Sequence, residues 1–189
     1  MSDTPVLAFD TSAAHCAVAL LLGDRIVAQV EDMGRGQAER LMPLVQELLD
    51  SEGVDLSAIG RIGIGIGPGN FTGIRISVSL ARGLALGLGI PAIGVSTLEA
   101  LRGFSAINTA AVAGPRETAY VQTGQATPKI LPHEDVPEGA EWLSDAGVLV
   151  GSIARLAQTA PVDGPAPAPL YLKPADAAPA RDAPPVILE

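Results

Sequence analysis

The order of strand-length and helix-length segments in the first hundred residues constrains the fold more than any other feature of this sequence. Three short apolar runs come first, joined by a polar turn and by Gly23-Asp24, a dipeptide typical of a β-hairpin. Helical and strand-like patterns then alternate, which predicts a mixed α/β unit. The expected strands are 6–10, 16–22, 25–31, 61–66 and 92–95, and the expected helices are 37–52, 72–89 and 96–104.

Both longer helical segments have an apolar face that could cover the chain's own sheet or meet another protein. Residues 37–52 place apolar side chains at the i, i+3, i+4, i+7 and i+8 positions of an amphipathic helix. Residues 72–89 are small or apolar around most of the circumference, apart from a polar line of Arg75, Ser79 and Arg82. A helix of that kind is buried on more than one side. The candidate interface residues are Leu41, Leu44, Val45, Leu48, Ile74, Ser77, Val78, Ala81 and Arg82.

Two turns that follow predicted strands could bind a nucleotide. The glycine-rich turn at 67–73 precedes a helix, whose free amides attract anions such as phosphate, but local chemistry favours the alternative, a tight turn in which Thr72 caps the helix. Asp10 could hold magnesium through water or close an Asx turn. No Walker loop or dinucleotide fingerprint is present. The candidate cleft residues are Asp10, Thr11, Ser12, Gly67, Gly69, Asn70, Thr72 and Gly73.

Charge and composition argue against several function classes. The chain has 12 basic and 21 acidic residues, a net charge of −9, which repels a nucleic-acid backbone. One cysteine and two histidines that are far apart in sequence give no metal-site spacing, and no nucleophile and base are paired in a known motif, so we expect no metal and no catalytic residue. The longest apolar run is too short to cross a membrane and no leader precedes the first strand, so a cytoplasmic location is expected.

The second half of the chain gives weaker signals. Short strands are expected at 110–113, 119–123 and 148–150, with a helical piece at 138–146. Eight of the 16 prolines lie at 161–189, where they exclude a helix and favour an extended tail that docks through Leu170, Tyr171 and Leu172. The expected organisation is a first lobe over 1–104, a smaller second lobe over 105–160 and a tail over 161–189.

Several motifs, in the same order, resemble those of the bacterial TsaB (YeaZ) proteins. The resemblance covers about residues 5 to 104 and is faint beyond them. It implies an actin/Hsp70-like ATPase fold of two RNase H-like lobes, with a complete N-terminal and a reduced C-terminal lobe. The matching segments are Val6 to Ser12, Glu39 to Pro43, Gly67 to Arg75, Gly83 to Ala85 and Gly94 to Leu98.

The resemblance also implies a non-catalytic role in tRNA threonylcarbamoyladenosine formation. Members of the family pair with the transferase TsaD, or with themselves when alone, through helices that match 37–52 and 72–89 here, and the ATPase TsaE joins them. The chain itself would then need no cofactor, ATP and magnesium would act only in the complex, and tRNA would be held indirectly. Nothing in the sequence supports the older glycoprotease label. The alternatives are an ATP-binding kinase-like enzyme and a stand-alone homodimer.

Two positions depart from the family pattern. Gln37 stands where many relatives have a histidine, which weakens any case for a metal. Gly114 stands where the family often has an aspartate before an arginine, so any role of that carboxylate is lost or moved.

Overall fold

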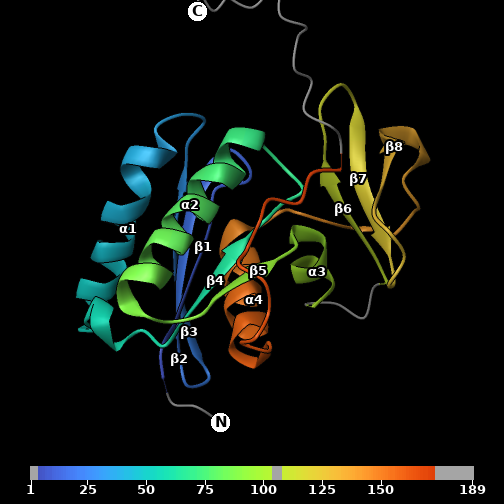
Figure 1. The fold of residues 1–189 in the computed structure, drawn as a ribbon. Helices are drawn as coiled ribbons and strands as arrows, with labels where there is room; N and C mark the ends of the chain where they lie inside the picture. Colours follow the sequence, from blue (N-terminus) through green and yellow to red (C-terminus); the bar gives the residue numbers. More distant parts are fainter. Residues whose placement is uncertain (1–3, 104–107, 173–189) are drawn as a thin grey trace, which may run out of the picture.

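The computed structural model describes residues 4–103 and 108–172, and Figure 1 shows two sheets that lie side by side. The first sheet has five strands in the order β3-β2-β1-β4-β5. Its first three strands form an antiparallel meander, while β4 and β5 run parallel to β1. Its elements are β1 (Val6–Asp10), β2 (His15–Leu22), β3 (Arg25–Asp32), α1 (Gln37–Glu52), the short 3-10 helix Leu56–Ala58, β4 (Arg61–Gly65), α2 (Phe71–Leu88), β5 (Ala92–Val95) and α3 (Thr97–Arg102). The predicted order of the first lobe is confirmed.

The first sheet is covered on both faces. All five residues of β1 are buried, and alternate side chains point to opposite sides. Leu7 and Phe9 pack with α1 and α2, whereas Val6 and Ala8 pack with the C-terminal helix α4 (Ala146–Thr159). Figure 1 shows α1 and α2 on one side of the strands and α4 on the other. A strand buried on both faces explains why β1 is apolar without alternation.

The ends of α1 and α2 follow from local backbone chemistry. Glycines in the left-handed conformation flank α1 at Gly36 and Gly53 and follow α2 at Gly89. The side chain of Asn70 caps α2 by accepting a hydrogen bond from the amide of Gly73 at 2.9 Å. The predicted cap at Thr72 is therefore wrong, because the helix begins one residue earlier, at Phe71.

The glycines of β4, Gly63 and Gly65, lie on one face of the strand and permit close packing there. A Cβ added at Gly63 would lie 2.9 Å from the Cβ of Ala157 and 3.0 Å from the carbonyl oxygen of Ile153. A Cβ at Gly65 would collide with the carboxylate of Asp10. Gly63 thus lets α4 approach the sheet, and Gly65 leaves room for a buried acid.

The second sheet has four strands in the order β8-β7-β6-β9. Of the expected strands, two are confirmed, and the predicted strand at 148–150 is wrong because Asp145 caps a helix there through the amides of Gly147 and Val148. The predicted helix at 138–146 is also wrong, since β9 lies within it. The strands are β6 (Thr109–Ala113), β7 (Thr118–Thr123), β8 (Lys129–Pro132) and β9 (Glu141–Trp142), with a 3-10 turn at His133–Asp135.

The helix α4 changes the predicted division of the chain. Leu149, Ile153 and Ala157 are fully buried in the cluster that contains Val6 and Ala8 of the first sheet. Residues 105–160 therefore do not form a separate lobe. The second lobe ends near β9, and the chain returns to complete the core of the first.

Residues 161–172, which we call the C-terminal strap, run extended over the edge of the first sheet. The amide of Leu170 donates to the carbonyl of Ile66 at 2.8 Å, and Pro167 is buried beside Gly94. The predicted docking through Leu170 and Tyr171 is confirmed. The rest of the predicted tail, 173–189, and the predicted helix end at 104 lie outside the described residues.

Among the described helices, α2 alone has the length and composition of a membrane span, with a mean hydropathy of 1.2 over 18 residues, of which 28% are buried. Helices that cover the sheet of a folded core pass the same test. Here α2 packs on β4 and β1, which accounts for its buried apolar face.

Candidate functional site

The carboxylate of Asp10 is fully buried at the end of β1. Its Oδ1 accepts hydrogen bonds from the Ser12 amide at 2.9 Å, from the Ser12 hydroxyl at 2.8 Å, and pairs with Nε2 of His15 at 2.8 Å. Its Oδ2 is buried with no partner among the described residues. The Asx-turn alternative is the one that the structure realises. No motif predicts the contact with His15, which β2 brings back beside β1.

The glycine-rich turn packs directly on the turn that holds Asp10. A Cβ at Gly73 would strike the carbonyl oxygen of Thr11, and a Cβ at Gly69 would strike that of Ser12. The backbone N–H of Asn70 donates to the Ser12 carbonyl at 2.6 Å, and the Thr11 hydroxyl donates to the Gly73 carbonyl at 2.6 Å. These glycines therefore allow two turns of one chain to touch.

This arrangement does not fit a magnesium nucleotide. Asp10 and Thr11 are fully buried, so neither can reach a metal or a phosphate without local unfolding. The backbone N–H groups of Asn70 and Gly73 already donate hydrogen bonds within the chain, so they are not free to bind a phosphate. Asp10 and Thr11 are therefore corrected from cleft residues to structural ones, and Ser12, Gly69 and Asn70 are the predicted residues that line an open space.

The predicted partner interface lies mostly inside the chain. Eight of its nine residues are at most 4% exposed, because they form the inner faces of α1 and α2 against the sheet. Arg82 is exposed. The small residues Gly73, Ser77 and Ala81, four apart on α2, also face inward, where Gly73 meets the Thr11 carbonyl. The interface prediction is wrong for Leu41, Leu44, Val45, Leu48, Ile74, Ser77, Val78 and Ala81.

A different line of residues faces outward from α2, which we call the outer stripe. Its members are spaced by four, three, four and three residues, so they lie on one side of the helix. Leu86, at its end, is 87% exposed. Beside the stripe, an apolar groove of about 380 Å³ lies between α2 and α1 and includes Met42 and Leu80. The outer stripe comprises Thr72, Ile76, Ser79, Gly83 and Leu86.

Charged side chains tie α1 to the edge strand β3. Arg40 pairs with Glu31 at 2.5 Å and with Glu47 at 2.6 Å. Hydrogen bonds from Arg40 lower the pKa of both carboxyl groups and raise the pKa of the guanidinium. Nearby, burial raises the pKa of the Cys16 thiol to about 11, with a smaller contribution from Glu31. A thiol of that kind is a poor nucleophile at neutral pH.

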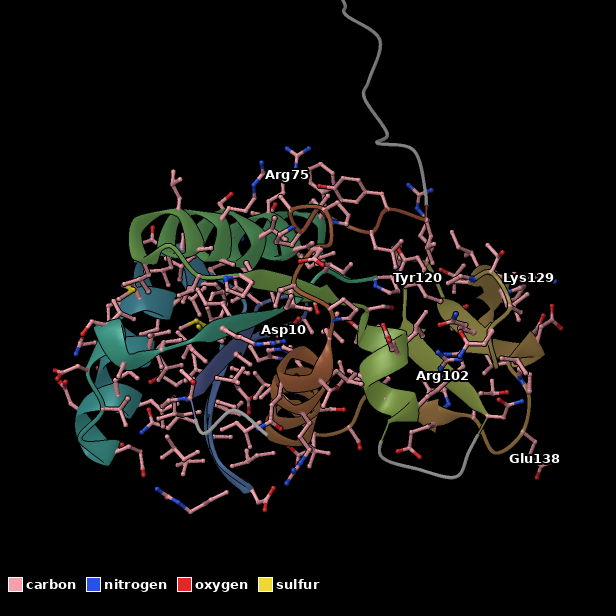
Figure 2. All side chains as sticks on the ribbon, turned by 60° about the horizontal axis from the view of Figure 1, so that its bottom comes forward. Asp10, Arg75, Arg102, Tyr120, Lys129 and Glu138 are labelled. Atoms are coloured by element: carbon pink, nitrogen blue, oxygen red, sulfur yellow. The ribbon has the colours of Figure 1, made fainter. Side chains whose placement is uncertain are left out.

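A cavity of about 600 Å³ lies between the two lobes. Figure 2 shows Asp10 within the first lobe and Tyr120 on the second. The first-lobe wall consists of Ser12, Ala13, Ala14, Gly34, Gln37, Gly69, Asn70 and Phe71, and the second-lobe wall of Val112, Ala113, Pro115, Tyr120 and Leu143.

Both departures from the family pattern have structural roles. Gln37 donates from Nε2 to the carbonyl of Ala13 at 3.1 Å and fastens α1 to the turn after β1. Gly114 donates to the carbonyl of Thr118 at 2.7 Å and closes the hairpin between β6 and β7. Arg116 and Glu117 take left-handed conformations in that hairpin.

Comparison with known proteins gives a consistent result. A family model described as TsaD, tRNA N6-adenosine threonylcarbamoyltransferase, matches residues 22–160. The tRNA threonylcarbamoyladenosine biosynthesis protein TsaB of Escherichia coli (strain K12) is 34% identical over 163 residues, which are 78% of this chain and 71% of that protein. TsaB of Bacillus subtilis (strain 168) is 38% identical over 97 residues, 51% of this chain and 42% of that protein.

Solved structures agree with the sequence relatives. YeaZ from Pseudomonas aeruginosa aligns with a TM-score of 0.72 and 29% identity, covering 89% of this chain and all of that one. A protein described as similar to peptidase YEAZ from Pseudomonas aeruginosa aligns with a TM-score of 0.74 and 30% identity, over 90% of this chain and all of that one. These matches and the two-sheet topology show that the chain belongs to the TsaB (YeaZ) family and has its actin/Hsp70-like ATPase fold.

Proposed function

We propose that this chain is a cytoplasmic, non-catalytic subunit in tRNA threonylcarbamoyladenosine biosynthesis, which pairs with TsaD in an assembly that TsaE joins. The process is the one for which its TsaB relatives are named. The chain's part in it is to provide a surface for TsaD. With a net charge of −9, it leaves most of the contact with tRNA to its partner.

The observation that carries this proposal is the outer stripe of α2. Leu86 is 87% exposed, and the small side chains of Ser79 and Gly83 beside it let another helix approach closely. A single exposed leucine is ordinary, but the apolar groove between α1 and α2, lined by Met42, Ile76 and Leu80, adds to it, and apolar surface of that kind supports an interaction site. The flanking cations Arg75 and Arg82 favour a partner with acidic residues beside its own apolar stripe.

The non-catalytic role is supported by the packing of the two candidate nucleotide-binding turns against each other. Asp10 accepts three hydrogen bonds within its own chain, and the Gly67–Gly73 turn contacts the Thr11–Ser12 backbone. This arrangement also argues against the kinase-like alternative. That alternative requires saturable ATP turnover by the isolated chain.

Reconstitution of tRNA modification tests the proposal. Purified TsaD is supplied with TsaE, ATP, a threonylcarbamoyl donor and a tRNA that reads codons beginning with A, with and without this chain. We expect modified adenosine only when the chain is present. Equal modification in its absence, or modification by this chain without TsaD, would contradict the proposal.

A further inference from the structure

The apolar groove between α1 and α2 lies directly beside the end of the C-terminal strap. Tyr171 of the strap stacks on Phe71, with 4.9 Å between the ring centroids, and its hydroxyl accepts a hydrogen bond from Arg75 at 2.8 Å. The guanidinium of Arg75 also lies over the Phe71 ring, and Arg75 lines the groove. Figure 2 shows Arg75 on the outside of α2. The chain that follows Leu172 therefore starts at the edge of the groove.

The sequence after the strap, residues 173–189, contains a single apolar run. Most of it consists of alanine, proline and charged residues. Apart from the prolines, its only apolar side chains larger than alanine are those of Val186, Ile187 and Leu188. The chain from Leu172 to Val186 can span on the order of 20–40 Å, whereas α2, with 18 residues, is about 27 Å long. The apolar run can therefore reach any part of the groove.

The lining of the groove matches a short apolar segment that ends in an acid. Its volume of about 380 Å³ lies near the lower end of the range for small-ligand sites, so it suits a few side chains. Arg75 is the one charged residue among the described residues that line it, and it forms no ion pair with any residue that the structure describes. A carboxylate follows the apolar run directly, at Glu189, and complements that cation. The partly exposed apolar walls are Met42, Ile76 and Leu80.

We propose that residues 186–188 dock in the groove between α1 and α2 of their own chain, with Glu189 beside Arg75. A docked run covers part of the outer stripe, so the tail competes with TsaD for this surface. The competition rests on the proposed function, whereas the docking itself does not depend on it. The residues common to the groove and the outer stripe are Thr72, Ile76 and Ser79.

The covalent link makes a weak contact sufficient. A segment tethered to its site by a flexible linker has an effective concentration on the order of 1 mM, so a few apolar side chains can fill the groove without high intrinsic affinity. We expect the docked form to be between about one and ten times as populated as the undocked form. Because TsaD binds the undocked form, its apparent affinity is reduced by the undocked fraction. Loss of docking should then tighten TsaD binding about 2- to 10-fold.

Calorimetric titration of TsaD with two variants of the full chain tests the competition. Ile187→Asp places a charge inside the apolar run and should bind TsaD more tightly than the wild-type chain, by the factor given above. Ala178→Asp adds the same charge to the same segment outside the run, so it should bind with the wild-type affinity. Equal affinities for Ile187→Asp and the wild-type chain would overturn the proposed competition.

Amide chemical shifts of the ¹⁵N-labelled full chain test the docking without TsaD. Ile187→Asp should move the signals of Ile76 and Leu80, and Ala178→Asp should not. A synthetic peptide of residues 183–189, added to the Ile187→Asp chain, should return both signals toward their wild-type positions.

Two results would overturn the docking. One is a set of groove signals that Ile187→Asp leaves unchanged. The other is a shift that depends on protein concentration, because that result would place the run in the groove of a second copy. If Ile187→Asp moves the groove signals while no variant binds TsaD, the docking is upheld and the proposed function is contradicted.

Discussion

The inner and outer faces of α2 contain the same kinds of side chain in opposite environments. Ala81 on the inner face is fully buried, whereas Leu86 on the outer face is 87% exposed. The inner face stabilises the fold because it packs on β4 and β1. Ile76 of the outer stripe still packs against the edge of the core, but Leu86 does not, and the proposed contact with TsaD would account for its exposure. Composition and periodicity therefore predict a helix such as α2, but they do not distinguish the face that packs on the sheet from the face that is exposed.

The largest predicted effect is on the inner face. Ala81→Glu buries an unpaired carboxylate and should cost about 3–5 kcal/mol, a large share of the roughly 5–15 kcal/mol that stabilises a typical domain. Urea unfolding followed by circular dichroism measures the loss. Ser79→Glu on the outer face is the matched control and should unfold at nearly the wild-type urea concentration. Equal loss in both variants would remove the distinction between the faces.

Glycines of α2 give the next contrast. Gly73→Ala places a methyl group against the Thr11 carbonyl and should lower the free energy of unfolding by about 3 kcal/mol. Gly83→Ala meets no atom within 4 Å and should raise it by about 0.5–1 kcal/mol, since alanine favours a helix. Both values come from the same urea titration. A stable Gly73→Ala variant would show that the turn is not packed as described.

Sequence reasoning worked where the pattern is local. The bounds of α1 and the order of the first five strands follow from periodicity and glycine positions. It failed for Val148 to Val150, because a three-residue apolar run fits a strand or a buried helix, and only the Asp145 cap distinguishes them. It also assigned Val78 and Ala81 to the wrong side of α2, since both sides are apolar.

For the site, sequence reasoning found the residues and left their use open. Asp10 and Ser12 form the Asx turn that was one of two alternatives. The partners that decide its role, His15 and the Gly73 backbone, are brought there by the sheet and by α2. The polar residues that line the cavity between the lobes, among them Gln37 and Tyr120, come from separate elements, and no motif joins them in the sequence.

The strap provides a smaller test. Tyr171→Ala removes a stacked ring and a hydrogen bond to Arg75 on a partly exposed surface, and should cost about 1 kcal/mol of stability. Tyr171→Phe keeps the ring and should cost less than half as much. Thermal or urea unfolding of the two variants separates stacking from hydrogen bonding. Wild-type stability of Tyr171→Ala would mean that the strap does not support Phe71.

The buried thiol predicts a pH dependence. Because burial raises the pKa of Cys16 from its ordinary 9.0 to about 11, the folded chain keeps a proton that the unfolded chain releases. This contribution to stability is complete below pH 9 and is lost as the pH rises to about 11. Cys16→Ala should show a shallower decline in urea midpoint across that range. Identical declines would contradict the assigned burial.

The outer stripe itself should matter least for stability and most for association. Leu86→Glu changes an exposed side chain, so its urea midpoint should stay within about 0.5 kcal/mol of wild type. Val148→Glu is the matched control, an exposed apolar residue on α4, across the sheet from α2.

Size-exclusion chromatography with light scattering, on each variant mixed with TsaD from the same source, tests the central claim most directly. The wild-type chain and Val148→Glu should elute with TsaD at the mass of a heterodimer. Leu86→Glu, equally folded, should elute separately from TsaD. A heterodimer peak of unchanged size and position for Leu86→Glu would contradict the assignment of the outer stripe of α2 as the surface that meets TsaD.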